Sequence, residues 1–167
     1  MNDVIKNSIL FISLILIQVI VLNNVLFWGY INPFLYILFI IVYPLKRDRG
    51  LFLFLSFLMG LCIDFFVDSG GINAAATLFI AYIRLPLLKG LLRKSEIDFP
   101  VFNINKLPFL RLLSFIAIIT FSHHFIIYSL EYFKFNAILT IFSRTFLTSV
   151  FTIILLIFSL LIMDKGK

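Results

Sequence analysis

The chain has 167 residues, of which 62% are hydrophobic and 13% are charged, and its formal net charge is +6. Soluble domains contain about 45–50% apolar and about 25% charged residues, so this composition indicates a membrane protein. Spans of about 20 residues would use nearly the whole length, which excludes a large soluble domain. We therefore expect one integral membrane domain over residues 1–167, an all-α polytopic bundle of about six transmembrane helices.

The positive charge does not indicate a nucleic-acid-binding surface. The basic residues stand in short runs beside apolar segments, where they determine membrane topology. We expect no nucleic-acid partner. The single cysteine, Cys62, excludes an internal disulfide and a cysteine-based zinc site, and it is predicted to be a small buried hydrophobe.

The first apolar segment, 5–22, is predicted to be a retained transmembrane helix. Residues 9–22 have the length of a signal-peptide core, but no small-residue cleavage site follows them. Two asparagines end the segment, and an interfacial aromatic anchor is expected after them, formed by Phe27, Trp28 and Tyr30.

The second apolar segment, 33–44, is short. Asn32 and Pro33 make a good helix start, but 12 residues rise only about 18 Å, against a hydrocarbon core of about 30 Å. Two explanations stay open. Either residues 25–30 add irregular backbone buried in protein, or the segment is re-entrant.

The third and fourth spans, 51–67 and 73–92, are predicted to form a hairpin after a basic turn at 46–49. Small and polar residues in the third span recur every four positions, which predicts a single helix face: Ser56, Gly60, Asp64 and Asp68. A similar row in the fourth span favours close helix packing: Ala74, Thr77, Ala81 and Arg84. Gly70 and Gly71 break the chain between the spans. Carboxylates in an apolar setting are costly, so this hairpin is the first place to look for function.

The fifth and sixth spans, 112–130 and 136–163, follow a polar connection at 89–111 that contains two prolines. One predicted face of the fifth span carries Ala117, Thr120 and His124. Four-residue intervals in the sixth span connect Thr140, Arg144, Thr148 and Thr152.

Charge counting predicts a cytoplasmic C-terminus, and it fits an arrangement in which the N-terminus lies on the same side without fixing that end. This arrangement puts eleven Lys and Arg residues inside and only Lys134 outside, with Arg84 and Arg144 within spans. Lys6 is the only basic residue that bears on the N-terminus.

In this topology five polar residues enter the membrane from the outer side: Asp64, Asp68, His123, His124 and Arg144. Counting the rise per residue places His123 and Arg144 about 10 Å below the outer turns and Asp64 about 6 Å below its own. One hypothesis is an outward-facing cluster in which Arg144 is the counter-ion of Asp64 or of a bound anion. The alternative is an internal ion pair that fixes helix order. Arg84, about 8 Å from its cytoplasmic end, is expected to extend its side chain to the interface.

The sequence favours neither an enzyme nor a metalloprotein. It has no His-Glu-x-x-His, Gly-x-Ser-x-Gly or Walker motif. Asp64 and Asp68 share one helix, so they cannot straddle a scissile bond as an aspartyl dyad does. His123 and His124 point about 100° apart and cannot both face one metal. We expect no catalytic residue, cofactor or metal.

A series of residues in the first 85 positions resembles MreD, the membrane subunit of the bacterial rod-shape and cell-elongation machinery, in the form found in Bacteroidetes-like bacteria. The hairpin part of the series is Gly60-x-x-x-Asp64, Gly71 and Ala74-Ala75-Ala76. The N-terminal part is Gln18, Asn23-Asn24, Gly29-Tyr30-Ile31-Asn32-Pro33 and Pro44-Leu45. Residues 86–167 match in hydropathy only.

The resemblance implies a non-catalytic scaffold of the bacterial inner membrane. MreD-like proteins bind MreC and belong to a complex with the actin-like MreB and the RodA/penicillin-binding peptidoglycan synthase. The family fold is also similar to the substrate-binding subunits of energy-coupling-factor vitamin transporters. The alternative function is therefore that of a small-molecule-binding transporter subunit, and contacts with membrane lipid and a homo-oligomer are compatible with either function.

Overall fold

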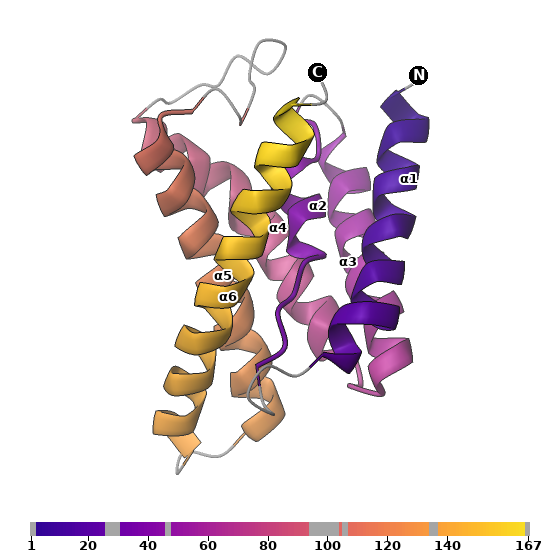
Figure 1. The fold of residues 1–167 in the computed structure, drawn as a ribbon, viewed down its shortest axis with the longest axis vertical. Helices are drawn as coiled ribbons and strands as arrows, with labels where there is room; N and C mark the ends of the chain where they lie inside the picture. Colours follow the sequence, from indigo (N-terminus) through magenta and orange to yellow (C-terminus); the bar gives the residue numbers. More distant parts are fainter. Residues whose placement is uncertain are drawn as a thin grey trace.

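The computed structural model describes residues 3–25, 31–45, 48–93, 104, 107–133 and 137–165. Over these residues the chain is an all-α bundle (Figure 1). The predicted aromatic anchor at 27–30, the basic residues at 46–47, most of the 89–111 connection and Lys134 lie outside the described residues.

Five helical segments are long and apolar enough to cross a membrane, so this is a multi-pass membrane protein. The first consists of α1 (Asp3–Leu16), the π-helical turn η1 (Ile17–Val21) and the short 3-10 turn η2 (Leu22–Asn24). The others are α3 (Arg49–Val67), α4 (Ile72–Leu92), α5 (Phe109–Tyr132) and α6 (Ile138–Lys165). These confirm five of the predicted spans.

The second predicted span is built differently. Only α2 (Ile37–Val42) is helical, and residues 31–36 precede it without a helix. Residues 31–34 can extend about 13 Å, residues 35 and 36 form a turn, and the six helical residues add about 9 Å, which together cover most of a hydrocarbon core of about 30 Å. Figure 1 shows the segment running between the end of the bundle where η2 lies and the end where α3 begins. Non-helical backbone is therefore found at 31–36, whereas the predicted contribution of residues 25–30 lies, except for Val25, outside the described residues.

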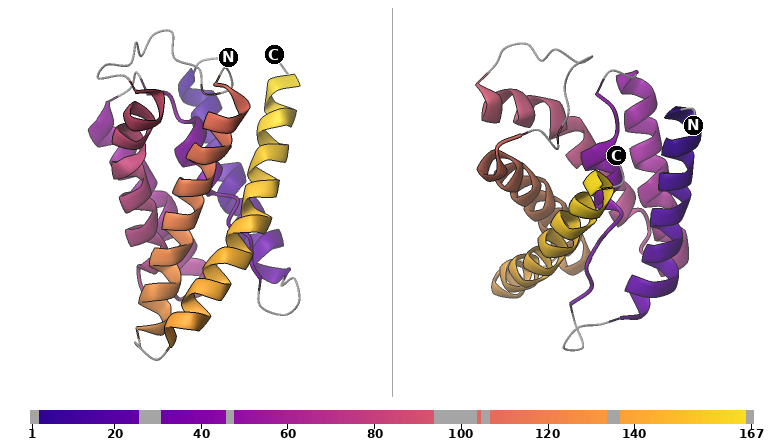
Figure 2. Two further views of the ribbon diagram at one scale, coloured as in Figure 1. Left: turned by 90° about the vertical axis from the view of Figure 1, so that its left-hand side faces the viewer. Right: turned by 45° about the horizontal axis from the view of Figure 1, so that its top comes forward.

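The bundle has two chemically different ends. The starts of α1, α3 and α5 and the ends of α4 and α6 lie together at one end (Figures 1 and 2). This basic end carries Lys6, Arg49, Lys89, Arg93 and Arg111. The opposite end holds the turn between α3 and α4 and the termini of α5 and α6 that face it, with the acidic residues Asp68 and Glu131.

The core of the bundle is centred on the second segment. The residues from Tyr36 to Ile41 are all at most 3% exposed, and Tyr43 is 2% exposed. Large apolar side chains on the outer helices are exposed instead, as with Phe65 at 83% and Phe158 at 62%. Lipid is the natural solvent for such faces.

The α3–α4 pair packs through small residues, as predicted. A Cβ atom on Gly60 would lie 2.6 Å from the Cα atom of Ala74, so only glycine permits this approach. Ala74, Thr77 and Ala81 are all buried.

The predicted α3 face, however, ends before Asp68. The helix stops at Val67, and Asp68 takes a left-handed conformation with φ 56° and is exposed. The chain reverses through Gly70 and Gly71, whose φ angles of 64° and 96° suit glycine.

Candidate functional site

Asp64 is buried at 4% exposure and closes the α3–α4 turn. Its Oδ2 atom accepts from the backbone N–H of Ala74 at 2.8 Å, and its Oδ1 atom accepts from the backbone N–H of Asn73 at 2.9 Å. Oδ1 also accepts from the Ser69 hydroxyl and, at 3.0 Å, from the Asn73 amide. These donors belong to the first turn of α4 and to the residues before it, so the carboxylate caps that helix and interacts favourably with its positive end.

Asn73 extends the contact from Asp64 into the centre of the bundle. Its Nδ2 group donates to Asp64 and Ser69, which leaves its Oδ1 atom to accept from the Tyr36 hydroxyl at 2.6 Å. Since the hydroxyl proton is used there, the 3.1 Å contact between Tyr36 and His123 requires His123 Nε2 to be the donor. One hydrogen-bonded chain thus connects α3, α4, the segment 31–45 and α5, and we call it the central polar chain.

Gln18 satisfies the non-helical backbone from the α1 side. It is fully buried in the π-helical turn, and its Oε1 atom accepts from the Leu35 N–H at 2.8 Å. Its Nε2 group donates to the carbonyl of Pro33 at 3.1 Å and to Asn23 at 2.9 Å. A membrane interior supplies no water for such groups, so a side chain has to replace the missing backbone partners.

Thr152 performs the same role from α6. Its hydroxyl oxygen accepts from the Phe34 N–H at 3.2 Å and lies 3.2 Å from His124 Nε2. His124 Nδ1 lies 2.7 Å from the Thr120 carbonyl, which can only accept, so Nδ1 carries the proton and Nε2 accepts from Thr152. The two histidines therefore have separate partners on separate elements.

Arg84 satisfies the other end of the same segment. It is 3% exposed and donates through Nη2 to the carbonyls of Ile41 at 3.0 Å and Tyr43 at 2.6 Å. Its guanidinium lies 5.0 Å from the centre of the Phe52 ring. The expectation that Arg84 extends to the interface is wrong, because the unpaired carbonyls at the end of α2 draw it inward.

Arg144 is not the partner of the Asp64 carboxylate. Both Asp64 oxygens are held by residues 69–74, so the expected counter-ion role is taken by backbone and side-chain N–H and O–H groups. Arg144 lies with its guanidinium 5.5 Å from the centre of the Tyr132 ring. It faces the same cavity as Asp68, while His123 and His124 lie in the buried core.

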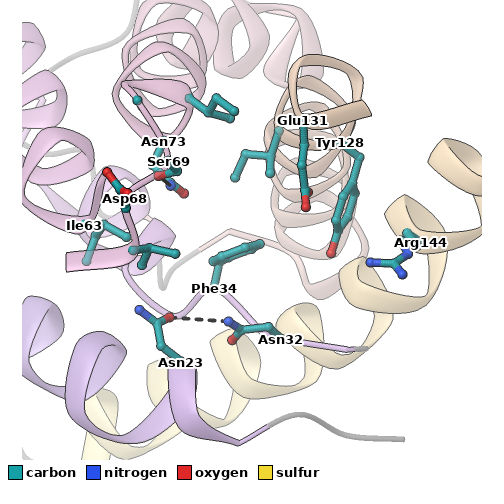
Figure 3. A pocket seen from close by; sticks show the side chains of 14 residues that line it. Asn23, Asn32, Phe34, Ile63, Asp68, Ser69, Asn73, Tyr128, Glu131 and Arg144 are labelled. Atoms are coloured by element: carbon teal, nitrogen blue, oxygen red, sulfur yellow. Dashed lines mark hydrogen bonds between the residues drawn. The ribbon is translucent and has the colours of Figure 1, made fainter. Parts of the chain in front are cut away.

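A cavity of about 720 Å³ opens at the acidic end, next to the central polar chain. Figure 3 shows its wall, to which α3, α4, α5, α6 and the 31–36 stretch all contribute. The polar lining comprises Asn23, Asn32, Asp68, Ser69, Asn73, Tyr128, Glu131 and Arg144. The apolar part includes Phe34, Ile63, Val67 and Ile127. Concave sites with a few converging polar groups on an apolar wall are typical of ligand pockets, and this volume is in their range.

Sequence reasoning missed Tyr36 and Asn73, the two middle members of the central polar chain. The available signal was a phenol and an amide within otherwise apolar runs. It also missed the buried hydroxyls of Thr145 and Ser149, while Thr140 of the predicted α6 row is exposed. A strict four-residue interval turns about 40° per step around a helix, so a long row cannot stay on one face.

Among the described residues, no group of three or more His, Cys, Asp or Glu side chains is placed to hold a metal ion. Chemically, the arrangement can fix a non-helical segment inside the membrane and can offer a pocket beside it. Comparisons with family models, with curated proteins and with solved structures found no match for this chain.

Proposed function

We propose that this protein is a non-catalytic, MreD-like scaffold of the cell-elongation complex in the bacterial inner membrane. In this role it binds an MreC-like protein and, through the complex, MreB and the RodA/penicillin-binding synthase, and so controls cell shape and peptidoglycan synthesis. The resemblance over the first 85 residues supplies the identity of these partners.

The observation that carries the proposal is the use that the fold makes of Asp64. A carboxylate in a membrane helix often marks proton or ion transfer. Here four hydrogen bonds from Ser69, Asn73 and Ala74 occupy it, and they belong to the turn it caps. This supports a structural role for Asp64, which fixes the α3–α4 turn, rather than a role as a reactive group.

The motifs of the resemblance support the same proposal. Gln18 holds the backbone of the 31–36 stretch, and Gly60 lets α3 and α4 meet. Residues that resemble the family pattern therefore build one architecture, an intramembrane segment fixed by its neighbours. A rigid bundle with exposed apolar helix faces suits a protein that binds other membrane spans.

The proposed orientation follows from the basic end. Lys6, Arg49, Lys89 and Arg93 lie there with both helical termini of the chain, which favours a cytoplasmic location for that end. The acidic end and its cavity are then on the outer side of the inner membrane.

The cavity favours a second candidate function. A pocket of about 720 Å³ with convergent polar groups is what a small-molecule-binding transporter subunit requires. We expect vitamins to produce no thermal shift in the purified protein, and a reproducible shift would favour this second function.

Affinity purification from the native cell in mild detergent tests the two proposals. The scaffold proposal expects MreC-like and synthase partners to co-purify. Recovery of ABC-type ATPases in their place would reject it and support the transporter subunit.

Replacing Asp64 with Asn tests whether the capped α3–α4 turn is needed for function. The amide keeps the size but offers one acceptor oxygen in place of two, so we expect a loss of about 2 kcal/mol and weaker partner recovery with unchanged membrane insertion. The matched control is Asp164→Asn, an exposed acid at the basic end. Wild-type cell shape and partner recovery in Asp64→Asn would show that the scaffold function does not need Asp64.

A further inference from the structure

Polar side chains are concentrated on the inner faces of α5 and α6. α6 packs chiefly against α5, and the two helices run side by side in Figures 1 and 2. The polar side chains on these inner faces are at most 5% exposed, and we call them the α5–α6 seam. They are Thr120, His123, His124 and Tyr128 on α5 and Thr145, Thr148, Ser149 and Thr152 on α6. Hydrocarbon offers such groups no partner, so each needs one inside the bundle.

Four polar atoms of the seam are without a partner. They are buried and make no hydrogen bond within the described part of the chain: the hydroxyl oxygens of Thr120, Thr145 and Ser149 and the Nδ1 atom of His123. Buried polar atoms normally bond to the protein or to ordered water. A hydroxyl group can turn to a carbonyl of its own helix, but an imidazole lone pair needs a donor from outside. His123 is therefore the member of the seam that most requires a ligand.

Thr120 and His123 are placed to hold one water molecule between them. They are three positions apart on α5, and side chains at this spacing are neighbours, with Cβ atoms about 5–6 Å apart. Nε2 of His123 donates to Tyr36, so its Nδ1 atom can only accept. A water molecule with hydrogen bonds of about 2.8 Å bridges polar atoms about 4–6 Å apart and can donate to Nδ1.

The seam begins at the cavity of the acidic end. Tyr128 lines that cavity, and its hydroxyl group lies 2.9 Å from the Thr148 hydroxyl on α6. One turn farther inward, His124 Nε2 lies 3.2 Å from the Thr152 hydroxyl. Polar groups on the two helices therefore follow one another in step from the cavity to the centre of the bundle. They form a continuous polar path along which the cavity is the nearest source of water.

We propose that the α5–α6 seam binds water, with one molecule bridging Thr120 and His123 and others at the hydroxyl groups of Thr145 and Ser149. The ligand is water rather than a larger molecule, because these four side chains are at most 3% exposed and three of them offer both a donor and an acceptor. The seam then gives the two buried histidines contact with water while the rest of the core stays dry. This inference is independent of the scaffold function.

Radiolytic footprinting of the purified full-length protein in detergent tests for this water. Ionising radiation converts bound water into hydroxyl radicals in place, and mass spectrometry then locates the oxidised side chains. We expect oxidation of His123 and His124. Met59 is the internal control, because it is 0% exposed within the apolar core and methionine is itself readily oxidised. Histidines as unreactive as Met59 would overturn the proposal, and so would equal oxidation of Met59, which indicates general entry of solvent.

Thr120→Val tests the bridging molecule. Valine keeps the shape of threonine but cannot hold the water, so we expect loss of His123 oxidation and a fall of about 2–4 °C in the unfolding temperature, as for one lost hydrogen bond. Thr140→Val is the matched control, since it makes the same change at an exposed position of α6 and should alter neither quantity. An unchanged or raised unfolding temperature in Thr120→Val, which an unpaired hydroxyl in a dry core would give, contradicts the bridge. Unchanged His123 oxidation contradicts it as well.

Ser149→Ala tests the α6 side of the seam. We expect its unfolding temperature to fall by a similar amount, because the hydroxyl loses a water partner. Ser159→Ala on the same helix removes a hydroxyl that bonds only the carbonyl of Leu155, and its fall should be smaller. A fall in Ser149→Ala no larger than in Ser159→Ala would overturn the seam as one water-binding site.

Discussion

The bundle contains two ways of placing a backbone in a membrane. The long helices α3 to α6 pair their own N–H and C=O groups, so their side chains serve mainly packing. The segment 31–45 has only six helical residues and takes its partners from Gln18, Thr152 and Arg84, which lie on three other helices. The comparison teaches that several polar residues within the spans of this protein serve a neighbouring backbone, and their polarity alone is a poor guide to chemistry.

The largest effect is expected from replacing Arg84, the α4 residue that hydrogen-bonds the backbone of the segment 31–45. Arg84→Met keeps a long apolar side chain but leaves the carbonyls of Ile41 and Tyr43 without their donor. We expect a loss of about 2–6 kcal/mol, since each of the two unsatisfied buried carbonyls costs about 1–3 kcal/mol. The free energy of unfolding in detergent measures it. The matched control, Arg49→Met, alters an exposed residue over Tyr82 and should cost far less. Equal losses for the two variants would contradict the role given to Arg84.

The contact between α3 and α4 should instead be sensitive to the volume of the side chains in it. Gly60→Ala forces a Cβ atom against the backbone of Asn73 and Ala74, and we expect about 1–3 kcal/mol of destabilisation from overpacking. Gly90→Ala is the matched control, because nothing lies within 4 Å of its added Cβ atom and alanine is the better helix former. Thermal unfolding of the two variants side by side checks the difference. A stable Gly60→Ala protein would show that α3 and α4 are farther apart than described.

The smallest effect is expected at Thr152. Thr152→Val keeps the shape and removes the hydroxyl that joins Phe34 and His124, for a loss of about 1 kcal/mol. Ser159→Ala on the same helix removes a hydroxyl that bonds only the carbonyl of its own helix at Leu155. Unfolding free energies for the pair test the comparison directly, and a larger cost at Ser159 would break it.

Hydropathy was enough to predict the five helical crossings and the short second one. It could not show how residues 31–36 are stabilised, because their partners are 15 to 118 positions away in sequence, at Gln18 and Thr152. The small-residue row through Gly60 and Ala74 was predicted from spacing, since close packing needs only the local helix period.

The partners of the charged residues within the spans were harder to predict. Depth along a helix suggested that Asp64 and Arg144 lie near one another, but depth does not fix direction. The left-handed turn at Asp68 and the two glycines bring the start of α4 back over Asp64, and local donors reach it first. Arg84 was assigned to the interface because nothing in its own helix showed the unpaired carbonyls of α2.

The support that Thr152 gives to Phe34 also sets an order of events during biosynthesis. Thr152 is in α6, 118 positions after Phe34, so the N–H of Phe34 gains this partner only after all the helices between them have been synthesised. The preceding helices can insert into the bilayer one by one, but residues 31–36 cannot form all of their final hydrogen bonds until α6 is inserted. Insertion of α6 is therefore required before the middle of the bundle reaches its final hydrogen bonding.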